Sequence, residues 1–141
     1  MLGRLVRAEG QSRSARTVEL YGWLLLLEGA ACLIAPDAVA SLLRLPSFVA
    51  PQAASYFRLA GVWVMGIGLL YGLSGRLDAS GFVFATLLDR PLVAPLMAIL
   101  WSLGILPGTL ALAAGLQDGL SALWTLRAWR GESASAASRP R

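Results

Sequence analysis

Two acidic side chains and one arginine interrupt stretches of this 141-residue chain that are otherwise apolar. Glu28 and Asp118 lie near the centres of the first and last of these stretches, and Arg58 lies near the start of the second. A charge at the centre of a bilayer costs at least about 2.5–3.5 kcal/mol on insertion scales, so it persists only with a partner or a task. Two interpretations follow. Either Arg58 neutralises the acids in a structural network, or the three side chains line a cavity in which an acid handles a proton.

Other kinds of site have few residues to build on, because the chain has no histidine and one cysteine, Cys32. Histidine is the commonest metal ligand and the usual general base. A single cysteine allows no intrachain disulfide and no cysteine-rich metal site. We therefore expect no metal and no cofactor, and we interpret Cys32 as an inert apolar side chain.

The composition indicates a lipid environment. Hydrophobic residues make up 57% of the chain and charged residues 14%, whereas ordinary soluble domains have about 45–50% and about 25%. The formal charge is +4, with twelve basic residues that are all arginine. These arginines lie mostly in the two tails instead of forming a patch on a soluble fold, so we expect no nucleic-acid partner.

Four apolar stretches approach the roughly 20 residues with which a helix crosses a bilayer. They cover approximately residues 18–36, 56–73, 90–106 and 108–129. The third is preceded by Asp89-Arg90-Pro91, and proline resists continuation of a helix, so residues 79–89 are expected to form a short interfacial helix. Residues 37–45 are interpreted in the same way. The sequence thus predicts an all-α fold, an integral membrane four-helix bundle with short interfacial helices, over residues 18–130.

The tails and the loops set the predicted topology. Residues 1–17 form a basic tail and residues 131–141 a Ser/Ala-rich tail that we expect to be disordered. With four spans, ten arginines lie on the side of both tails, and only Arg44 and Arg58 lie on the other. The positive-inside rule then places both termini in the cytoplasm, with the chain in the cell (inner) membrane among membrane lipids. A cleaved signal peptide is the less favoured interpretation of the first segment, because Glu28 interrupts its apolar run.

Small residues share helix faces with the charges, which indicates helix–helix packing. Asp118 lies on a face of small side chains, and Arg58 begins a row of glycines. Asp89 and Arg90 form a possible pair at the inner interface. The candidate packing residues are Gly61, Gly68, Gly72, Gly115 and Gly119.

Several of these features together resemble the DoxX-like superfamily, including its BphX-like branch. They are the glutamate at position 28 before Pro36, the segment Tyr56-Phe57-Arg58-Leu59-Ala60-Gly61, and Asp118 before Leu123-Trp124-Thr125. The resemblance covers roughly residues 18–130. It implies a small four-helix membrane protein in which Glu28, Arg58 and Asp118 are important. Some members are subunits of membrane oxidoreductases and others are membrane chaperones, so the resemblance implies no particular reaction.

Two functions remain open. We favour an accessory protein, not itself an enzyme, that assembles with another membrane protein or enzyme system, or with copies of itself. The alternative is a membrane module or enzyme that binds a hydrophobic small molecule, lipid or quinone-like, in a cavity lined by Glu28, Arg58 and Asp118. Nothing in the sequence identifies a substrate.

Overall fold

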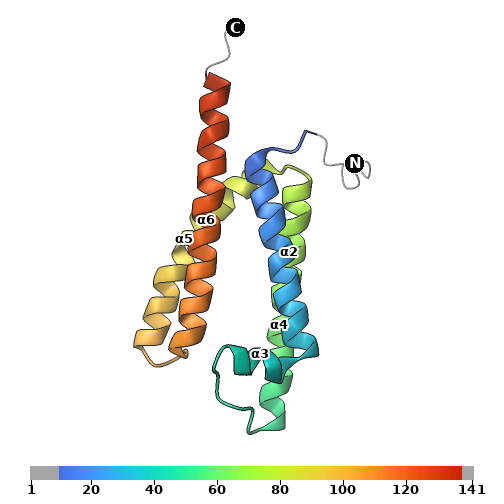
Figure 1. Ribbon diagram of the computed structural model, residues 1–141, viewed down its shortest axis with the longest axis vertical. Coiled ribbons are helices and arrows are strands. Elements are labelled where there is room, and N and C mark those ends of the chain that lie inside the picture. Colours follow the sequence, from blue (N-terminus) through green and yellow to red (C-terminus); the bar gives the residue numbers. More distant parts are fainter. Residues whose placement is uncertain (1–9, 138–141) are drawn as a thin grey trace.

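The computed structural model describes residues 10–137, which fold into five α-helices with no strand among them. The helices are α2 (Arg13–Ile34), α3 (Pro36–Leu42), α4 (Pro51–Arg76), α5 (Ser80–Ser102) and α6 (Gly108–Ala137). The beginning of α2 and the ends of α4 and α6 lie at one end of the molecule, here named the Arg13 end (Figure 1). The predicted all-α fold class is confirmed.

Three of the long helices, α2, α4 and α5, are long and apolar enough to cross a membrane. Large apolar side chains on them are exposed, among them Trp63, Leu92 and Ile34, which is 79% exposed. Such surfaces are suited to lipid, because acyl chains are as apolar as the side chains that meet them. Helix α6 does not reach the same hydropathy, since Gln117 and Asp118 interrupt its apolar centre. Length and composition therefore support three of the four predicted spans.

Helices α2 and α4 form a close antiparallel pair in which small residues face one another at intervals of seven. A seven-residue repeat keeps one seam of each helix facing its partner, and small side chains there let the two backbones approach. From the α3 end to the Arg13 end, the facing residues are Gly29 with Gly61, Gly22 with Gly68, and Ala15 with Gly75.

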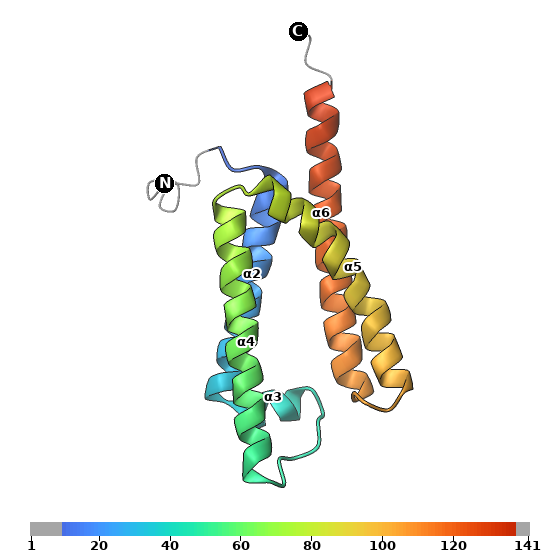
Figure 2. The same cartoon turned by 180° about the vertical axis from the view of Figure 1, so that it is seen from behind.

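The structure differs from the prediction at the start of α5. The expected interfacial helix at residues 79–89 is not separate, because α5 continues as one helix through Pro91 and Pro95. Its first turns cross from the end of α4 towards α6, and its later turns run beside α6 (Figure 2). Prolines are tolerated in membrane helices where neighbouring groups satisfy the carbonyls they leave free. The consequence is that Arg90 lies inside the helix assembly and not at its edge.

The predicted tails are also shorter than expected. Helix α2 begins at Arg13, and the Ser12 side chain caps it by accepting a hydrogen bond from the Ala15 N–H at 3.1 Å. Helix α6 extends to Ala137, so the predicted disorder is wrong for residues 131–137. Glu132 accounts for part of this extension, because its carboxylate accepts hydrogen bonds from the backbone N–H and hydroxyl of Ser14, at 3.0 and 2.7 Å. The outer parts of both tails lie outside the described residues.

The α2–α4 contact predicts which glycine substitutions disrupt the fold. In Gly68→Val the new Cβ would lie 2.6 Å from the Leu26 backbone nitrogen and 2.8 Å from the Gly22 carbonyl oxygen. Overpacking of this kind costs about 1–3 kcal/mol, so we expect a lower melting temperature in detergent micelles. Gly66→Val is the matched control on the same helix, since a Cβ there meets nothing within 4 Å. Equal melting temperatures for the two variants would contradict this packing.

Candidate functional site

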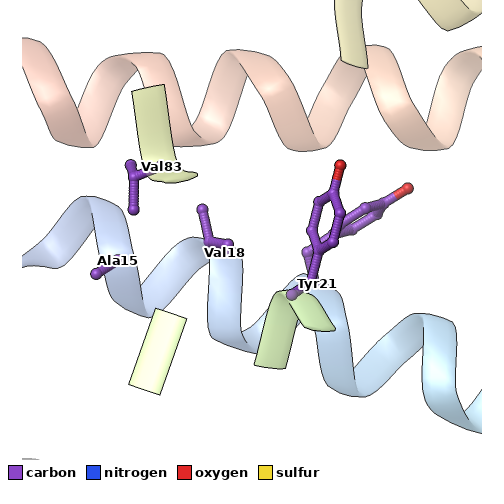
Figure 3. Packing of buried hydrophobic residues seen from close by; sticks show 5 residues of the cluster. Ala15, Val18, Tyr21 and Val83 are labelled. Atoms are coloured by element: carbon purple, nitrogen blue, oxygen red, sulfur yellow. The ribbon is translucent and has the colours of Figure 1, made fainter. Parts of the chain in front are cut away.

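The two helix pairs, α2 with α4 and α5 with α6, meet near the Arg13 end around a small apolar cluster. Ala15, Val18 and Tyr21 of α2 share this cluster with Val83 of α5, and Val83 lies nearer to Ala15 and Val18 than to Tyr21 (Figure 3). Tyr71 of α4 completes the cluster, with its ring centroid 5.8 Å from that of Tyr21 in an edge-to-face arrangement. Both tyrosines of this cluster also make polar contacts, Tyr21 with Asp118 and Tyr71 with Asp89.

A row of hydrogen bonds joins α2 to α6 beside this cluster, and we name it the α2–α6 seam. From the Arg13 end inwards, the first three bonds have their donor on α2, and the last has its donor on α6. Its bonds are Ser14 to Glu132, Thr17 to Thr125 at 2.9 Å, Tyr21 to Asp118 at 2.6 Å, and Gln117 to Glu28 at 2.8 Å. Glu28 and Asp118 therefore both face the helix interface, and each accepts a hydrogen bond from a neutral side chain.

Arg58 does not join the two acids. Its side chain is exposed near the start of α4, and among the described residues no hydrogen bond or ion pair connects it to Glu28 or Asp118. Because Gly29 faces Gly61, Arg58 lies about one helical turn beyond the level of Glu28. The predicted network of Glu28, Arg58 and Asp118 is not assembled.

The arginine that does lie in the interior is Arg90, which is only 1% exposed. Its guanidinium carbon lies 4.3 Å from the centre of the Tyr21 ring and 5.0 Å from that of Tyr71. Cation–π attraction of this kind strengthens when the pair is removed from water. The Nη1 group donates to the Thr125 hydroxyl at 3.3 Å, whereas Nε and Nη2 are buried and have no hydrogen-bond partner.

Asp89 and Arg90 turn to different neighbours, although the sequence suggested them as a pair. The Tyr71 hydroxyl donates to the Asp89 carboxylate at 3.2 Å, and no ion pair joins Asp89 to Arg90 in the described part of the chain. Two tyrosines thus each present a ring to the buried cation and a hydroxyl to a carboxylate. The sequence missed this arrangement because a helix break expected at Pro91 put Arg90 at the interface.

The predicted packing glycines divide into two groups. Gly61 and Gly68 lie against the backbone of α2, where a Cβ would collide. A Cβ on Gly72 or Gly119 would point into open space, and one on Gly115 would meet Ala94 at an ordinary 3.5 Å. Gly115 and Gly119 instead line a hollow on the surface of the α5–α6 pair.

Two donors of the Arg90 guanidinium have no acceptor among the described residues. The Nε and Nη2 groups share one edge of the guanidinium, and that edge can donate two parallel hydrogen bonds to a pair of oxygens. Within residues 10–137, no group of three or more His, Cys, Asp and Glu side chains lies close enough together to hold a metal ion.

Comparison of the chain with protein-family models, with curated proteins and with solved structures finds no match. The resemblance to DoxX-like proteins therefore stays a prediction from the residues quoted above.

The Tyr21–Asp118 bond can be tested without disturbing the ring above Arg90. Tyr21→Phe removes only the hydroxyl, which leaves the Asp118 carboxylate without its donor. A buried acceptor without a partner costs about 1–3 kcal/mol, so the variant should melt at a lower temperature in detergent. Tyr56→Phe is the control, because Tyr56 is 70% exposed. A Tyr21→Phe protein as stable as the wild type would mean that this bond does not hold α2 to α6.

Proposed function

We propose that the chain is an integral protein of the cell (inner) membrane with four spanning helices, of which α6 is the fourth. Both termini would lie in the cytoplasm. The α2–α6 seam supports a spanning α6, because Gln117 and Asp118 bond to α2 instead of meeting lipid. Polar groups in hydrocarbon persist when another helix satisfies them. The distribution of arginine supports the orientation, since Arg13, Arg16 and Arg76 begin or end helices at the Arg13 end.

The function that the geometry supports best is that of an accessory protein that assembles with another membrane protein. The observation that carries it is an uncovered apolar hollow along the α5–α6 pair. Two adjoining parts, of about 430 and 510 Å³, share Ala94, Gly115 and Leu116. Small residues in a membrane-facing groove allow a second helix to approach closely. We therefore assign the hollow to an apolar transmembrane helix of a partner protein.

The polar residues favour this scaffold role as well. Three acids that could act as general acids or bases instead accept hydrogen bonds between helices. They are Glu28, Asp118 and Glu132. An acid that accepts a hydrogen bond from a neighbouring helix fixes which helices pair and in what axial register. A relationship to DoxX-like proteins, some of which are subunits or chaperones, is part of this proposal and rests on the sequence resemblance alone.

A second candidate is a module that binds a hydrophobic small molecule. The buried Nε and Nη2 groups of Arg90 favour it, because they offer two donors to an oxygen acceptor that the chain does not supply. We expect Arg90→Met to lose any small molecule that co-purifies with the wild type, and Arg58→Met to retain it as the control. Identical extracts from both variants and the wild type would exclude Arg90 as a ligand-binding residue.

The accessory role predicts a specific effect of filling the hollow. Gly119→Leu places a side chain in open space, so the melting temperature of the isolated protein should stay close to that of the wild type. The same side chain would occupy the partner's place, and in cells the protein should lose its co-purifying membrane partner or its larger assembly. Cross-linking in membranes followed by mass spectrometry would measure this.

Gly131→Leu is the matched control on α6, since Gly131 is exposed, lies outside the hollow, and also leaves a Cβ in open space. If the Gly119→Leu protein keeps the same cross-linked species as Gly131→Leu, the hollow is not the assembly surface. Cross-links between two copies of the chain would identify the partner helix as belonging to a homo-oligomer.

A further inference from the structure

We propose that the groove between α2 and α4 at the Arg13 end binds one phospholipid that has a zwitterionic headgroup with a primary amine. The proposal rests on the membrane location proposed above. The groove lies on the α2–α4 pair, and the α5–α6 hollow shares none of its lining residues. It joins an ion pair to an apolar hollow of about 480 Å³.

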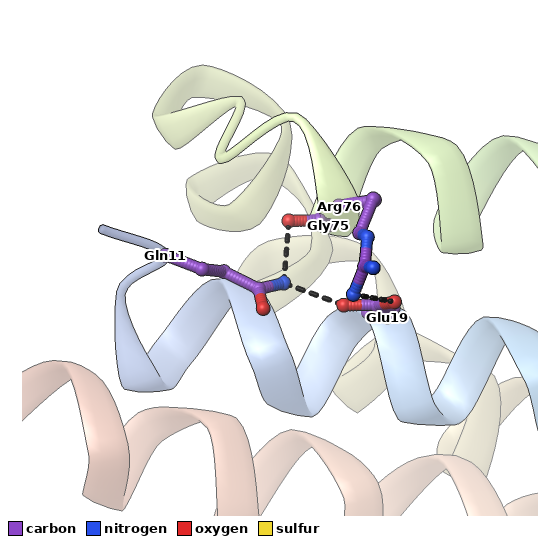
Figure 4. Close-up of polar contacts among 4 residues, drawn as sticks. All are labelled: Gln11, Glu19, Gly75 and Arg76. Carbon is purple, nitrogen blue, oxygen red and sulfur yellow. Dashed lines mark hydrogen bonds and ion pairs between the residues drawn. The ribbon is translucent and has the colours of Figure 1, made fainter. Parts of the chain in front are cut away.

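The polar end of the groove is built from Glu19 of α2 and Arg76 of α4. Arg76 Nη1 lies 3.2 Å from Glu19 Oε1, and the two side chains are 28% and 11% exposed. Gln11 holds the carboxylate from the other side by donating to Glu19 Oε2 at 2.7 Å and to the Gly75 carbonyl at 2.9 Å (Figure 4). A negatively charged and a positively charged side chain are therefore held side by side where α4 ends.

The apolar part of the groove begins directly below this pair. Glu19 and Leu26 are separated by seven residues, so the groove extends about 10 Å along α2 from the ion pair into the span. Its floor is open because Gly72 has no side chain, and a Cβ added there would meet nothing within 4 Å. The remaining lining side chains are Trp23, Leu26, Leu69 and Leu73.

This order of groups matches the order of groups in a phospholipid. Arginine binds phosphate through charge-assisted hydrogen bonds. A carboxylate oxygen has more than one lone pair, so each Glu19 oxygen can accept from an ammonium besides its present donor. The acyl chain would then lie in the apolar part of the groove. The charges of phosphate and amine are opposite to those of Arg76 and Glu19, and this complementarity favours a zwitterionic headgroup over a purely anionic one.

The test measures lipid retention by the full chain. The protein is reconstituted in nanodiscs that contain equal amounts of phosphatidylethanolamine and phosphatidylglycerol, transferred to mild detergent, and analysed by native mass spectrometry. We expect one phosphatidylethanolamine to remain bound to the wild type. Gly72→Leu adds a side chain to the groove, and its Cβ meets nothing within 4 Å, so the variant should retain about tenfold less lipid. Gly66→Leu on the same helix should behave as the wild type, since a Cβ there also lies in open space.

Two further variants keep the test decisive. Trp23→Ala widens the groove without a collision and should also reduce retention, because the apolar contact with Trp23 is lost. Glu19→Gln removes the charge that attracts the amine, so its retained lipid should shift from phosphatidylethanolamine to phosphatidylglycerol. Unchanged retention in both Gly72→Leu and Trp23→Ala would overturn the site, and an unchanged lipid ratio in Glu19→Gln would overturn the choice of headgroup. Failure of the wild type to enter nanodiscs at all would instead overturn the membrane location.

Discussion

The rest of the structure depends on the close approach of the α2 and α4 backbones. Gly22 and Gly29 on one helix face Gly68 and Gly61 on the other, at distances that leave no room for a Cβ. Because the contacts repeat every seven residues on both helices, the two helices have one favourable axial register and one favourable rotation about their axes. That register places the Tyr21 and Tyr71 rings next to each other, and these two rings hold Arg90. A shift of α4 along α2 would separate the rings and leave the buried cation without its support.

The second helix pair is joined to the first by a small apolar cluster and by the hydrogen bonds of the α2–α6 seam. In lipid the hydrophobic effect does not drive helices together, so close packing and hydrogen bonds between helices have to do so. The structure uses each in a different place: small residues join α2 to α4, and the seam from Ser14 to Glu28 joins α2 to α6. The polar centre of α6 lowers its hydropathy for the same reason that it binds α2. With α6 as the fourth span proposed above, Gln117 and Asp118 would need α2 beside them.

Much of the architecture could be predicted from the sequence, because apolar length and helix-breaking residues are local properties. The all-helical fold and the inward direction of Glu28 and Asp118 followed from composition and helical spacing. The seven-residue spacing of Gly61, Gly68 and Gly75 is also visible in the sequence, although the predicted packing contact was the four-residue interval from Gly68 to Gly72. The partner of each acid could not be predicted. Tyr21 and Gln117 are neutral, and whether they reach the two acids depends on the axial position of α6 relative to α2.

The position of Arg90 could not be predicted from the local sequence. A proline after it predicts a helix terminus in water, but in a membrane helix the neighbouring helices can satisfy what the proline leaves open. Once α5 continues through Pro91, its first turns have to cross the end of the α2–α4 pair, and Arg90 is carried between the tyrosines. Three consequences then arise together: a buried cation, two tyrosine hydroxyls that turn to Asp118 and Asp89, and a guanidinium edge without an acceptor. The glycine register and the continuous α5 are both needed for this arrangement, so the interior of the protein is set by long-range packing and not by any one segment.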